Sequence, residues 1–198
     1  MFGGTVRGRT TTLRVPRESD LEAHTRWAAD MRVRRAGPIG RWHEPAASET
    51  WKERWAEQAK DKTSVLWSID AADSLAGYVR IKFEGAPHAD KVLIEQFVID
   101  PDRAGKGYGR DSAGALHRWI FDYMHLRMAV VGRIAADDLG RQRIFETLGH
   151  ERFGQGHRVY YRDGAYVDQY LYQMELSTWD ERWASEREYM PLGDDKAE

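Results

Sequence analysis

A glycine cluster that joins an apolar strand to a helix constrains this chain more than any other feature of its sequence. Residues 92–99 (VLIEQFVI) form its most strand-like run, Pro101 ends that run, and residues 107–125 have a helical period. Three glycines at alternate positions stand between them: Gly105, Gly107 and Gly109. Such glycines let the backbone turn tightly and point several N–H groups toward one place, and the start of the helix adds more. The sequence therefore predicts a phosphate cradle between a buried strand and a helix.

The spacing within the cluster excludes two common phosphate-binding motifs. A P-loop needs a glycine where Asp100 stands and Ser or Thr where Gly107 follows Lys106. A dinucleotide-binding motif needs G-x-G-x-x-G, but counted from Gly105 its last position is Arg110. A strand–helix turn that binds nothing is the structural alternative, although one glycine would suffice for such a turn.

Strand and helix patterns alternate along the rest of the chain. Strands are expected at 10–15, 65–70, 75–83, 92–99, 128–135, 152–161 and 165–175. Helices are expected after Ser19 and at 48–60, 107–125 and 138–148, and residues 31–47, rich in glycine and proline, are expected to be a loop. This order predicts one α/β domain over residues 1–176, with a mixed, largely antiparallel sheet of six to seven strands flanked by helices. Residues 177–198 are expected to be a charged helix with a frayed tail.

Composition narrows the class of function. Lys+Arg number 30 and Asp+Glu 32, so the net charge of -2 argues against a partner that is nucleic acid or an anionic membrane. No apolar run approaches the roughly 18 residues of a membrane span, and the first residues lack a signal peptide's apolar core. The absence of cysteine excludes disulfides, thiolate metal sites and cysteine nucleophiles, and the seven histidines show no metal-ligand spacing. We therefore expect a cytoplasmic protein without a metal.

The glycine cluster fits the pattern Q/R-x-x-G-x-G/A, and through it the chain resembles the GNAT family of acyl-CoA-dependent N-acyltransferases. The match runs from Ala104 to Gly109, after a strand that ends in VIDP. Downstream, FETLGHERFG (145–154) resembles the family's short helix and its Leu-Gly exit into the next strand. Upstream, TTLRVPRESDLEAHTRW resembles the opening of the branch that modifies ribosomal-protein N-termini and similar amines. The likeness spans residues 10–176.

The resemblance implies a cofactor and a place for it. Acetyl-CoA would be the co-substrate, lying where the sheet splays between residues 92–99 and 128–135, with its pyrophosphate on residues 104–110. The contacts implied on the cradle are those of Ala104, Gly105, Lys106, Gly107, Tyr108, Gly109 and Arg110. On the strand, Phe97, Val98 and Ile99 would contact the pantetheine arm and the thioester, and Asp138, which opens the short helix, would also lie at the cofactor.

Two departures from the family pattern bear on this assignment. The leading Gln or Arg is Ala104 here, with Arg103 one residue earlier; backbone N–H groups bind the phosphate, so we expect only a modest loss. The family's tyrosine that protonates the departing thiolate is Phe145, which has no proton to give. Another hydroxyl, such as that of Tyr108, or water would then be the acid, or the enzyme works without a dedicated one.

A base is needed because an amine attacks a thioester only in its neutral form. Glu95 is the candidate, since many family members carry a catalytic glutamate in this strand. A strict period of two places Glu95 on the face of Phe97 and Ile99, opposite Ile94 and Gln96. A carboxylate in so apolar a strand is costly to bury without a partner or a purpose. The alternative is a structural glutamate paired with a nearby Lys or Arg.

Other polar and aromatic residues have both a functional and a structural interpretation. His43 lies in a loop that borders the acceptor site in this family, but an exposed loop histidine explains it as well; His150 is expected to serve the fold. One group of arginines could bind an acidic acceptor or the CoA 3′-phosphate, or simply form a solvated helix end: Arg32, Arg34, Arg35 and Arg41. Several tryptophans could line an aromatic acceptor pocket or only pack a core: Trp27, Trp42, Trp51 and Trp55.

Together these observations predict an acetyl-CoA-dependent N-acetyltransferase that works by direct transfer in a ternary complex. The acceptor would be a primary amine on a small molecule or peptide, and a homodimer is compatible with the sequence. A catalytically weak acyl-CoA-binding regulatory module is the alternative that Phe145 favours, and a transferase for a longer acyl group is another.

Overall fold

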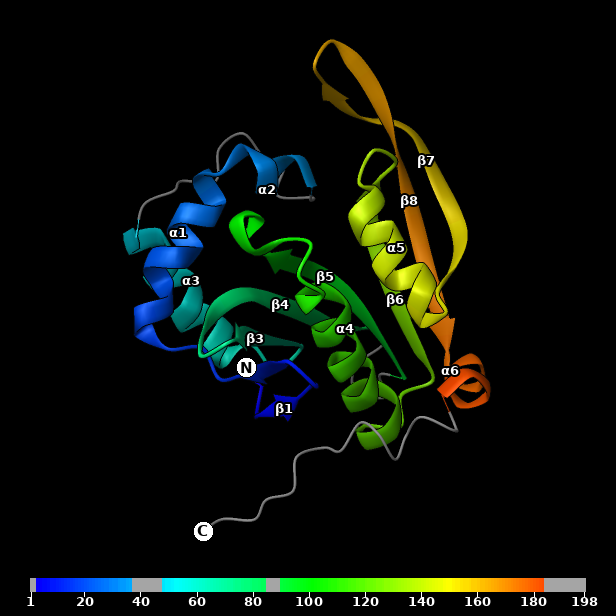
Figure 1. Ribbon diagram of the computed structural model, residues 1–198, viewed down its shortest axis with the longest axis horizontal. Coiled ribbons are helices and arrows are strands. Elements are labelled where there is room, and N and C mark those ends of the chain that lie inside the picture. Colours follow the sequence, from blue (N-terminus) through cyan, green and yellow to red (C-terminus); the bar gives the residue numbers. More distant parts are fainter. Residues whose placement is uncertain (1–2, 37–47, 85–89, 184–198) are drawn as a thin grey trace.

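One eight-stranded sheet organises the chain, in the order β1-β2-β3-β4-β5-β6-β8-β7 (Figure 1). The computed structural model describes residues 3–36, 48–84 and 90–183. The strands are β1 (Val6–Arg7), β2 (Thr11–Arg14), β3 (Ser64–Ala71), β4 (Ser74–Glu84), β5 (Lys91–Ile99), β6 (Met128–Ala135), β7 (Glu151–Arg162) and β8 (Ala165–Glu175). All neighbouring strands are antiparallel except β5 and β6, which are parallel. The predicted single α/β domain with a mixed, largely antiparallel sheet is confirmed.

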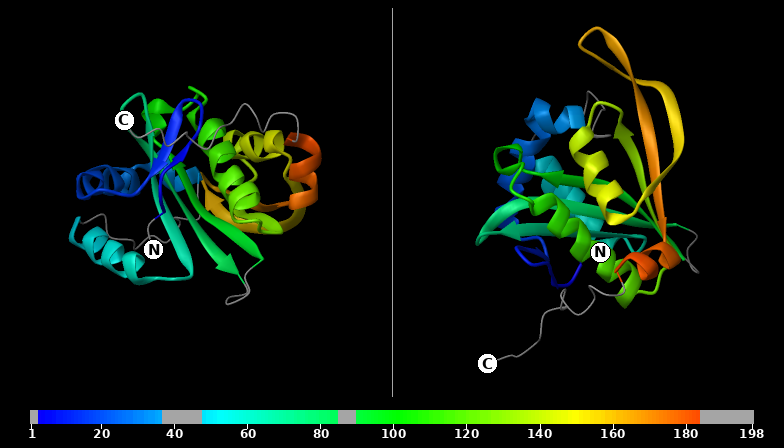
Figure 2. Two further views of the ribbon diagram at one scale, coloured as in Figure 1. Left: turned by 90° about the horizontal axis from the view of Figure 1, so that it is seen from below. Right: turned by 45° about the vertical axis from the view of Figure 1, so that its right-hand side comes forward.

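Helices cover both faces of this sheet. The α-helices are α1 (Leu21–Ala29), α2 (Met31–Ala36), α3 (Ser48–Lys60), α4 (Tyr108–Arg118), α5 (Leu139–Leu148) and α6 (Leu176–Trp183). Two short 3-10 turns, η1 (Glu18–Asp20) and η2 (Pro101–Arg103), and one π-helical turn, η3 (Trp119–Tyr123), complete the described helical elements. Figure 2 shows α1 and α3 on one side of the sheet and α4, α5 and α6 on the other.

Two expectations about the elements were wrong. The sheet has an eighth strand, β1, whose two residues are too few to show an alternating pattern. The segment 31–47, expected to be a loop, begins with α2, a helix of six residues. Six residues make fewer than two turns, which is too short for a helical period to be visible. Residues 37–47 of that segment lie outside the described part of the chain.

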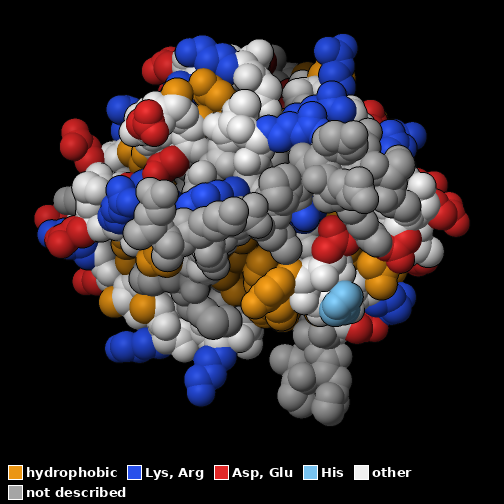
Figure 3. Space-filling model, turned by 60° about the horizontal axis from the view of Figure 1, so that its bottom comes forward, with side chains coloured by type: hydrophobic (Ala, Val, Ile, Leu, Met, Phe, Trp, Pro, Cys, Tyr) orange, Lys and Arg blue, Asp and Glu red, His pale blue; other side chains and the backbone are white. Residues whose placement is uncertain are grey.

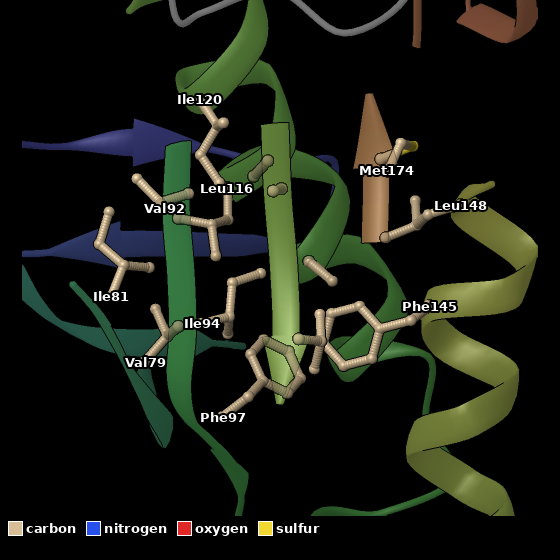
Figure 4. Close-up of a cluster of buried hydrophobic side chains, with 14 of the residues drawn as sticks. Val79, Ile81, Val92, Ile94, Phe97, Leu116, Ile120, Phe145, Leu148 and Met174 are labelled. Carbon is tan, nitrogen blue, oxygen red and sulfur yellow. The ribbon is translucent and has the colours of Figure 1, made fainter. Parts of the chain in front are cut away.

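The main hydrophobic core fills the space between the sheet and α4, α5 and α6. Side chains from β4, β5 and β8 meet those of α4, η3 and α5, as Figure 4 shows for Val79, Ile81, Val92, Ile94, Phe97, Leu116, Ile120, Phe145, Leu148 and Met174. α6 adds Trp179 and Trp183, whose indole N–H groups donate to Asp122 Oδ1 (2.8 Å) and the Leu148 carbonyl (2.9 Å). Helix α6 therefore packs into the same core as the rest of the domain.

The surface carries charges of both signs. Figure 3 shows Lys and Arg side chains interspersed with Asp and Glu on one face, in keeping with the nearly balanced composition. Within the described residues, no helix is both long and apolar enough to cross a membrane.

A pair of buried histidines lies in the main core. The Nε2 atoms of His117 and His150 are 2.7 Å apart, and His117 Nδ1 lies 2.6 Å from the Ala113 carbonyl oxygen. His117 therefore donates from Nδ1 and accepts at Nε2, which makes His150 the donor between the rings. Desolvation by burial lowers the pKa of His117 to about 4 and that of His150 well below its usual value, so both rings are neutral at pH 7.

This pair predicts a loss of stability in mild acid. The unfolded chain binds protons on these histidines as the pH falls below about 6.5, whereas the folded chain does not. The free energy of unfolding is therefore highest above that pH and falls as the pH is lowered toward 4. For His117 the loss amounts to about 3 kcal/mol. We expect the double variant His117→Leu/His150→Leu, measured by denaturant unfolding at pH 7 and pH 5, to lose less stability on acidification than wild type. His157→Leu, which replaces an exposed histidine, should keep the full loss; equal behaviour of the two variants would contradict the assignment.

Candidate active site

The centre of the sheet opens between β5 and β6. The two strands pair in parallel from Lys91 with Met128 to Ile94 with Val131, and within the described residues their pairing goes no further. Beyond Ile94 the edge of β5 that faces β6 has no strand partner, and the two strands diverge (Figure 1). Backbone N–H and C=O groups along such an edge are available to a ligand.

A β-bulge at Glu95 marks the point where the strands part. Arg80 of β4 lies opposite Gln96, and the next residue, Ile81, lies opposite Ile94, so Glu95 is the extra residue. The bulge interrupts the alternation of side chains, and Ile94 and Phe97 both pack in the main core. The expectation that Ile94 faces away from Phe97 was therefore wrong, because a strict period of two does not allow for an inserted residue.

A cavity of about 640 Å³ lies where β5 and β6 separate. It is lined by residues 96–99 of β5, by most of the segment 101–110, by the start of α5 and by Arg32 and Val33. All residues predicted to contact the cofactor line it except Lys106. The cavity lining also includes residues that the sequence did not predict: Gln96 and, in α5, Gly140, Arg141, Arg143 and Ile144. The i,i+4 spacing of Gly140 and Ile144 could have indicated that these two residues lie on the same face of α5.

The three glycines have two different roles. Gly105 (φ +79°) and Gly107 (φ +84°) adopt left-handed backbone conformations, and an added Cβ at either position would meet no atom within 4 Å. At Gly109 an added Cβ would lie 2.8 Å from Ile144 Cδ1. The first two glycines therefore shape the turn, and the third lets α4 approach α5.

The turn exposes a row of backbone donors. The Asp111 N–H donates to the Gly107 carbonyl (3.1 Å), and among the described residues no protein acceptor is found for the N–H groups of Gly105 through Arg110. The last three belong to the first turn of α4, where the helix dipole adds partial positive charge. Four arginines are also among the residues that line the cavity: Arg103, Arg110, Arg141 and Arg143. This arrangement suits an anion with several oxygens, such as a diphosphate.

Arg103 holds the turn against the sheet. Its guanidinium donates to the carbonyl oxygens of Ala71 (2.6 Å) and Leu75 (2.9 Å) and lies 5.1 Å from the centre of the Tyr108 ring. The arginine that precedes Ala104 therefore anchors η2 to the turn between β3 and β4.

Two carboxylates fix the elements that flank the turn. Asp111 of α4 accepts hydrogen bonds from the N–H groups of Arg9, Thr10 and Thr11, at 2.9 to 3.0 Å. Asp138 caps α5 by accepting from the Arg141 N–H (3.1 Å) and from the Arg141 guanidinium. Asp138 lines the cavity as predicted, but its carboxylate is already engaged in this cap.

A second cavity, of about 400 Å³, lies beside α1 and α3. Aromatic rings line it, at His24, Trp51, Trp55 and Tyr78, together with polar and charged side chains. Gln96 lines both cavities. Both cavities therefore reach Gln96 of β5, the residue next to the bulge.

Glu95 lies at this junction but lines neither cavity. Its Oε2 accepts hydrogen bonds from Arg80 Nη2 (2.6 Å) and Nε (2.9 Å), and its side chain is 23% exposed. Arg80 itself lines the second cavity. The structure thus includes the ion pair that the structural interpretation of Glu95 requires, and this pair lies beside the second cavity.

Phe145 is fully buried. Its ring centre lies 5.8 Å from that of Phe97 and 5.3 Å from that of His150, in the main core (Figure 4). The α5 residue at the cavity is its neighbour Ile144. The position that the resemblance gives to a proton donor therefore contains an apolar ring that does not line the cavity.

Of the remaining arginine, tryptophan and histidine candidates, only some lie in the described part of the chain. Arg32 lines the first cavity and pairs with Asp30 (2.7 Å) and Asp102 (2.9 Å). Arg41, Trp42 and His43 lie outside the described residues, and for Arg34 and Arg35 only the backbone, in α2, is described. Trp27 is buried in the core, whereas Trp51, also buried, and Trp55 line the second cavity.

Solved structures with the same fold include known acetyltransferases. A spermidine N-acetyltransferase from Vibrio cholerae, in complex with CoA and spermine, has a TM-score of 0.73 at 18% identity and covers 86% of this chain and 98% of its own. A GNAT-family acetyltransferase from Bacillus anthracis has a TM-score of 0.70 at 19% identity, with 88% and 99% covered. A candidate ribosomal-protein-serine acetyltransferase from V. cholerae has 0.64 at 13% identity, with 87% and 97% covered. These similarities show the fold.

The family follows from a match along the sequence. No curated protein sequence matches the chain. The family model of the acetyltransferase (GNAT) domain, however, matches residues 10–151, which include the cradle, β5, β6 and α5. The splayed sheet and the row of free N–H groups lie within this match, and the chain therefore belongs to the GNAT acetyltransferase family.

Proposed function

We propose that this chain transfers the acetyl group of acetyl-CoA directly to a primary amine within a ternary complex. The observation that carries the proposal is the row of N–H groups from Gly105 to Arg110, for which the described residues offer no acceptor, beside the first cavity. These donors, the start of α4 and the surrounding arginines match the negative charges of a CoA pyrophosphate.

The shape of the opening fits the rest of the cofactor. From the cradle, the pantetheine arm would extend along residues 96–99, where the edge of β5 lacks a strand partner. Backbone groups at Phe97 and Ile99 would bind the arm and polarise the thioester carbonyl. The thioester would then lie near Gln96, where the second cavity begins.

The amine would enter from the second cavity. It would approach Gln96 of β5 while the cofactor occupies the first cavity, so that both substrates are bound at once. The V. cholerae structure with CoA and spermine is a precedent for a small amine acceptor in this fold. That protein is 18% identical to this chain, so the acceptor of this chain depends on the residues of its own second cavity.

The reaction needs one proton removed and one delivered. The neutral amine attacks the thioester carbonyl carbon, the C–N bond forms, the C–S bond breaks and CoA leaves as a thiolate. We assign proton removal to Glu95, whose carboxylate Arg80 holds in place; because Glu95 lines neither cavity, the proton would reach it through a water molecule. With Phe145 in the core, the thiolate would take its proton from water or from Tyr108, which lines the first cavity. Most of the catalysis would be positioning.

A catalytically weak acyl-CoA-binding module is the competing function, favoured by the burial of Phe145. Isothermal titration with acetyl-CoA, followed by measurement of thiol release on a panel of primary amines, separates the two. Binding with amine-dependent thiol release supports the transferase. Binding without release from any amine supports the module, and no binding contradicts both.

The cradle predicts a specific loss of cofactor affinity. Gly107→Leu places a side chain at the cavity wall, and we expect the Kd for acetyl-CoA, measured by isothermal titration, to rise at least about 100-fold because the pyrophosphate can no longer approach the N–H groups. Gly164→Leu is a matched control, since Gly164 in the turn between β7 and β8 has a similar φ (+82°) and equally open surroundings. Both variants incur a backbone strain of about 1–2 kcal/mol. Equal affinities for the two variants would contradict the cradle assignment.

The assignment of Glu95 as the base predicts that its removal lowers turnover without lowering the affinity for acetyl-CoA. Glu95→Gln keeps the shape but removes the proton acceptor, so kcat should fall roughly 10²–10⁴-fold, while the Kd for acetyl-CoA should stay nearly unchanged. Glu84→Gln, which removes another strand glutamate paired with a cation (Lys91, 3.4 Å), should leave kcat unchanged. An unchanged rate in Glu95→Gln would assign the proton to water or to His43.

The burial of Phe145 predicts that a tyrosine at this position lowers the free energy of unfolding without raising turnover. Phe145→Tyr adds a hydroxyl to a packed core, so the free energy of unfolding should fall by about 1–3 kcal/mol. Turnover per folded molecule should stay the same, because the ring does not line the cavity. Phe121→Tyr, at another fully buried phenylalanine, should behave alike. A rise in turnover for Phe145→Tyr alone would show that its hydroxyl reaches the CoA sulfur, against our placement.

A further inference from the structure

Gln96 of β5 is the one described residue that lines both cavities. In the proposed function, the thioester lies in the first cavity and the amine enters from the second, so the C–N bond forms beside Gln96. That function assigns the Gln96 side chain no role. A polar side chain at this position is placed to contact the reacting atoms.

The register of the sheet shows on which face the Gln96 side chain lies. Val98, two residues later, packs with Tyr78 and with Trp27 of α1, and alternate residues of a strand share a face. Arg80, which lies opposite Gln96 on β4, lines the second cavity, and residues opposite each other on paired strands also share a face. The Gln96 carboxamide therefore lies on the side of the sheet that α1 and α3 cover (Figure 2).

The carboxamide of Gln96 has no hydrogen-bond partner in the described part of the chain, and Gln96 is only partly buried. Its neighbour Arg80 uses Nε and Nη2 to bind Glu95. Gln58, the other glutamine that lines the second cavity, donates to Ser64 Oγ at 2.9 Å. Gln96 therefore keeps both its donor and its acceptor groups available to a ligand.

The contact with Arg80 also prepares Glu95. Both N–H groups of Arg80 bind Oε2, at 2.6 and 2.9 Å, and Oε1 accepts no hydrogen bond from the described residues. Oε1 is thus the oxygen that can receive a proton. Glu95 lines neither cavity, whereas Gln96, the next residue along the chain, lines both. A group at Gln96 can therefore link the amine to Glu95.

The chemistry of the attacking nitrogen suits a neutral hydrogen-bond acceptor at this place. As the C–N bond forms, the nitrogen of a primary amine becomes positively charged and carries two N–H groups. One of them must lose its proton to the base, and the other can donate to an oxygen that holds the nitrogen in line with the carbonyl carbon. A second carboxylate here would instead favour the ammonium form of the free amine, which cannot attack.

We propose that Gln96 is a second catalytic residue of the acetyl transfer. Its Oε1 accepts a hydrogen bond from the attacking nitrogen, and its Nε2 donates to the water that passes the other proton to Glu95. The C–N bond forms, the C–S bond breaks with its electron pair on sulfur, and one proton moves from nitrogen through water to Glu95, while Gln96 gains and loses none. The inference rests on the proposed function, which brings both substrates to Gln96.

The first test is the variant Gln96→Met, which keeps an unbranched side chain of similar length without the carboxamide. With acetyl-CoA and the full chain, kcat for the panel amine that releases CoA fastest should fall about 10- to 100-fold. The Kd for acetyl-CoA, measured by isothermal titration, should change less than about twofold. Gln173→Met is the matched control and should keep the wild-type kcat, because Gln173 is a partly buried strand glutamine of β8 that lines neither cavity.

A second test depends on the number of N–H groups and not on the stability of a variant. The N-methyl derivative of the same amine has a single N–H group once the C–N bond forms, so it cannot serve both Gln96 and the water. The preference of the wild type for the primary amine, as a ratio of kcat/KM values, should exceed that of Gln96→Met at least about tenfold. Gln96→Glu, which retains an oxygen acceptor, should keep the wild-type preference. A purely structural role of Gln96 would leave this ratio unchanged in all three.

A third measurement needs no variant kinetics. In the wild-type chain with CoA and the amine bound, the side-chain NH₂ signals of Gln96 should shift relative to the chain with CoA alone. If the wild type releases CoA but Gln96→Met keeps its kcat and its preference, or the NH₂ signals stay in place, the inference is overturned and the transferase function stands. If no amine releases CoA from the wild type, the transferase function and the inference both fail.

Discussion

The short parallel pairing of β5 with β6 is the constraint on which the rest of the site depends. Four residues of each strand pair, and after Ile94 and Val131 the strands separate while β4 continues to pair with β5. The free edge of β5, the cavity beside it and the placement of α4 and α5 on either side of the opening all follow from that separation. A sheet that paired along its full length would have no room for a cofactor at its centre.

The glycine turn between β5 and α4 could be predicted from sequence because its signals are local. The apolar strand, Pro101, the alternate glycines and the helix that follows are contiguous, and each has one dominant backbone preference. The short helix and its Gly149 cap were visible for the same reason, since Gly149 adopts φ +116° there. The family's match over residues 10–151 then agrees with the fold that these local signals indicate.

Features formed by residues distant in sequence could not be predicted in the same way. The bulge at Glu95 depends on the register between β4 and β5, and neither strand shows it alone. The aromatic rings around His24 come from α1, α3 and β4, and no sequence pattern distinguishes this histidine from a core residue. Phe145 illustrates the same limit, because its alignment with a family tyrosine says nothing about the packing of its ring beside His117 and His150.

The central claim is that acetyl-CoA binds with its pyrophosphate on the N–H groups of residues 105–110 and its arm along β5. An amide NMR titration of the ¹⁵N-labelled chain with acetyl-CoA tests it directly, because each of these N–H groups gives its own signal. We expect large downfield proton shifts at Gly105 through Arg110, which form new hydrogen bonds to phosphate, together with shifts along residues 96–99. Binding that leaves the signals of residues 105–110 in place would contradict it.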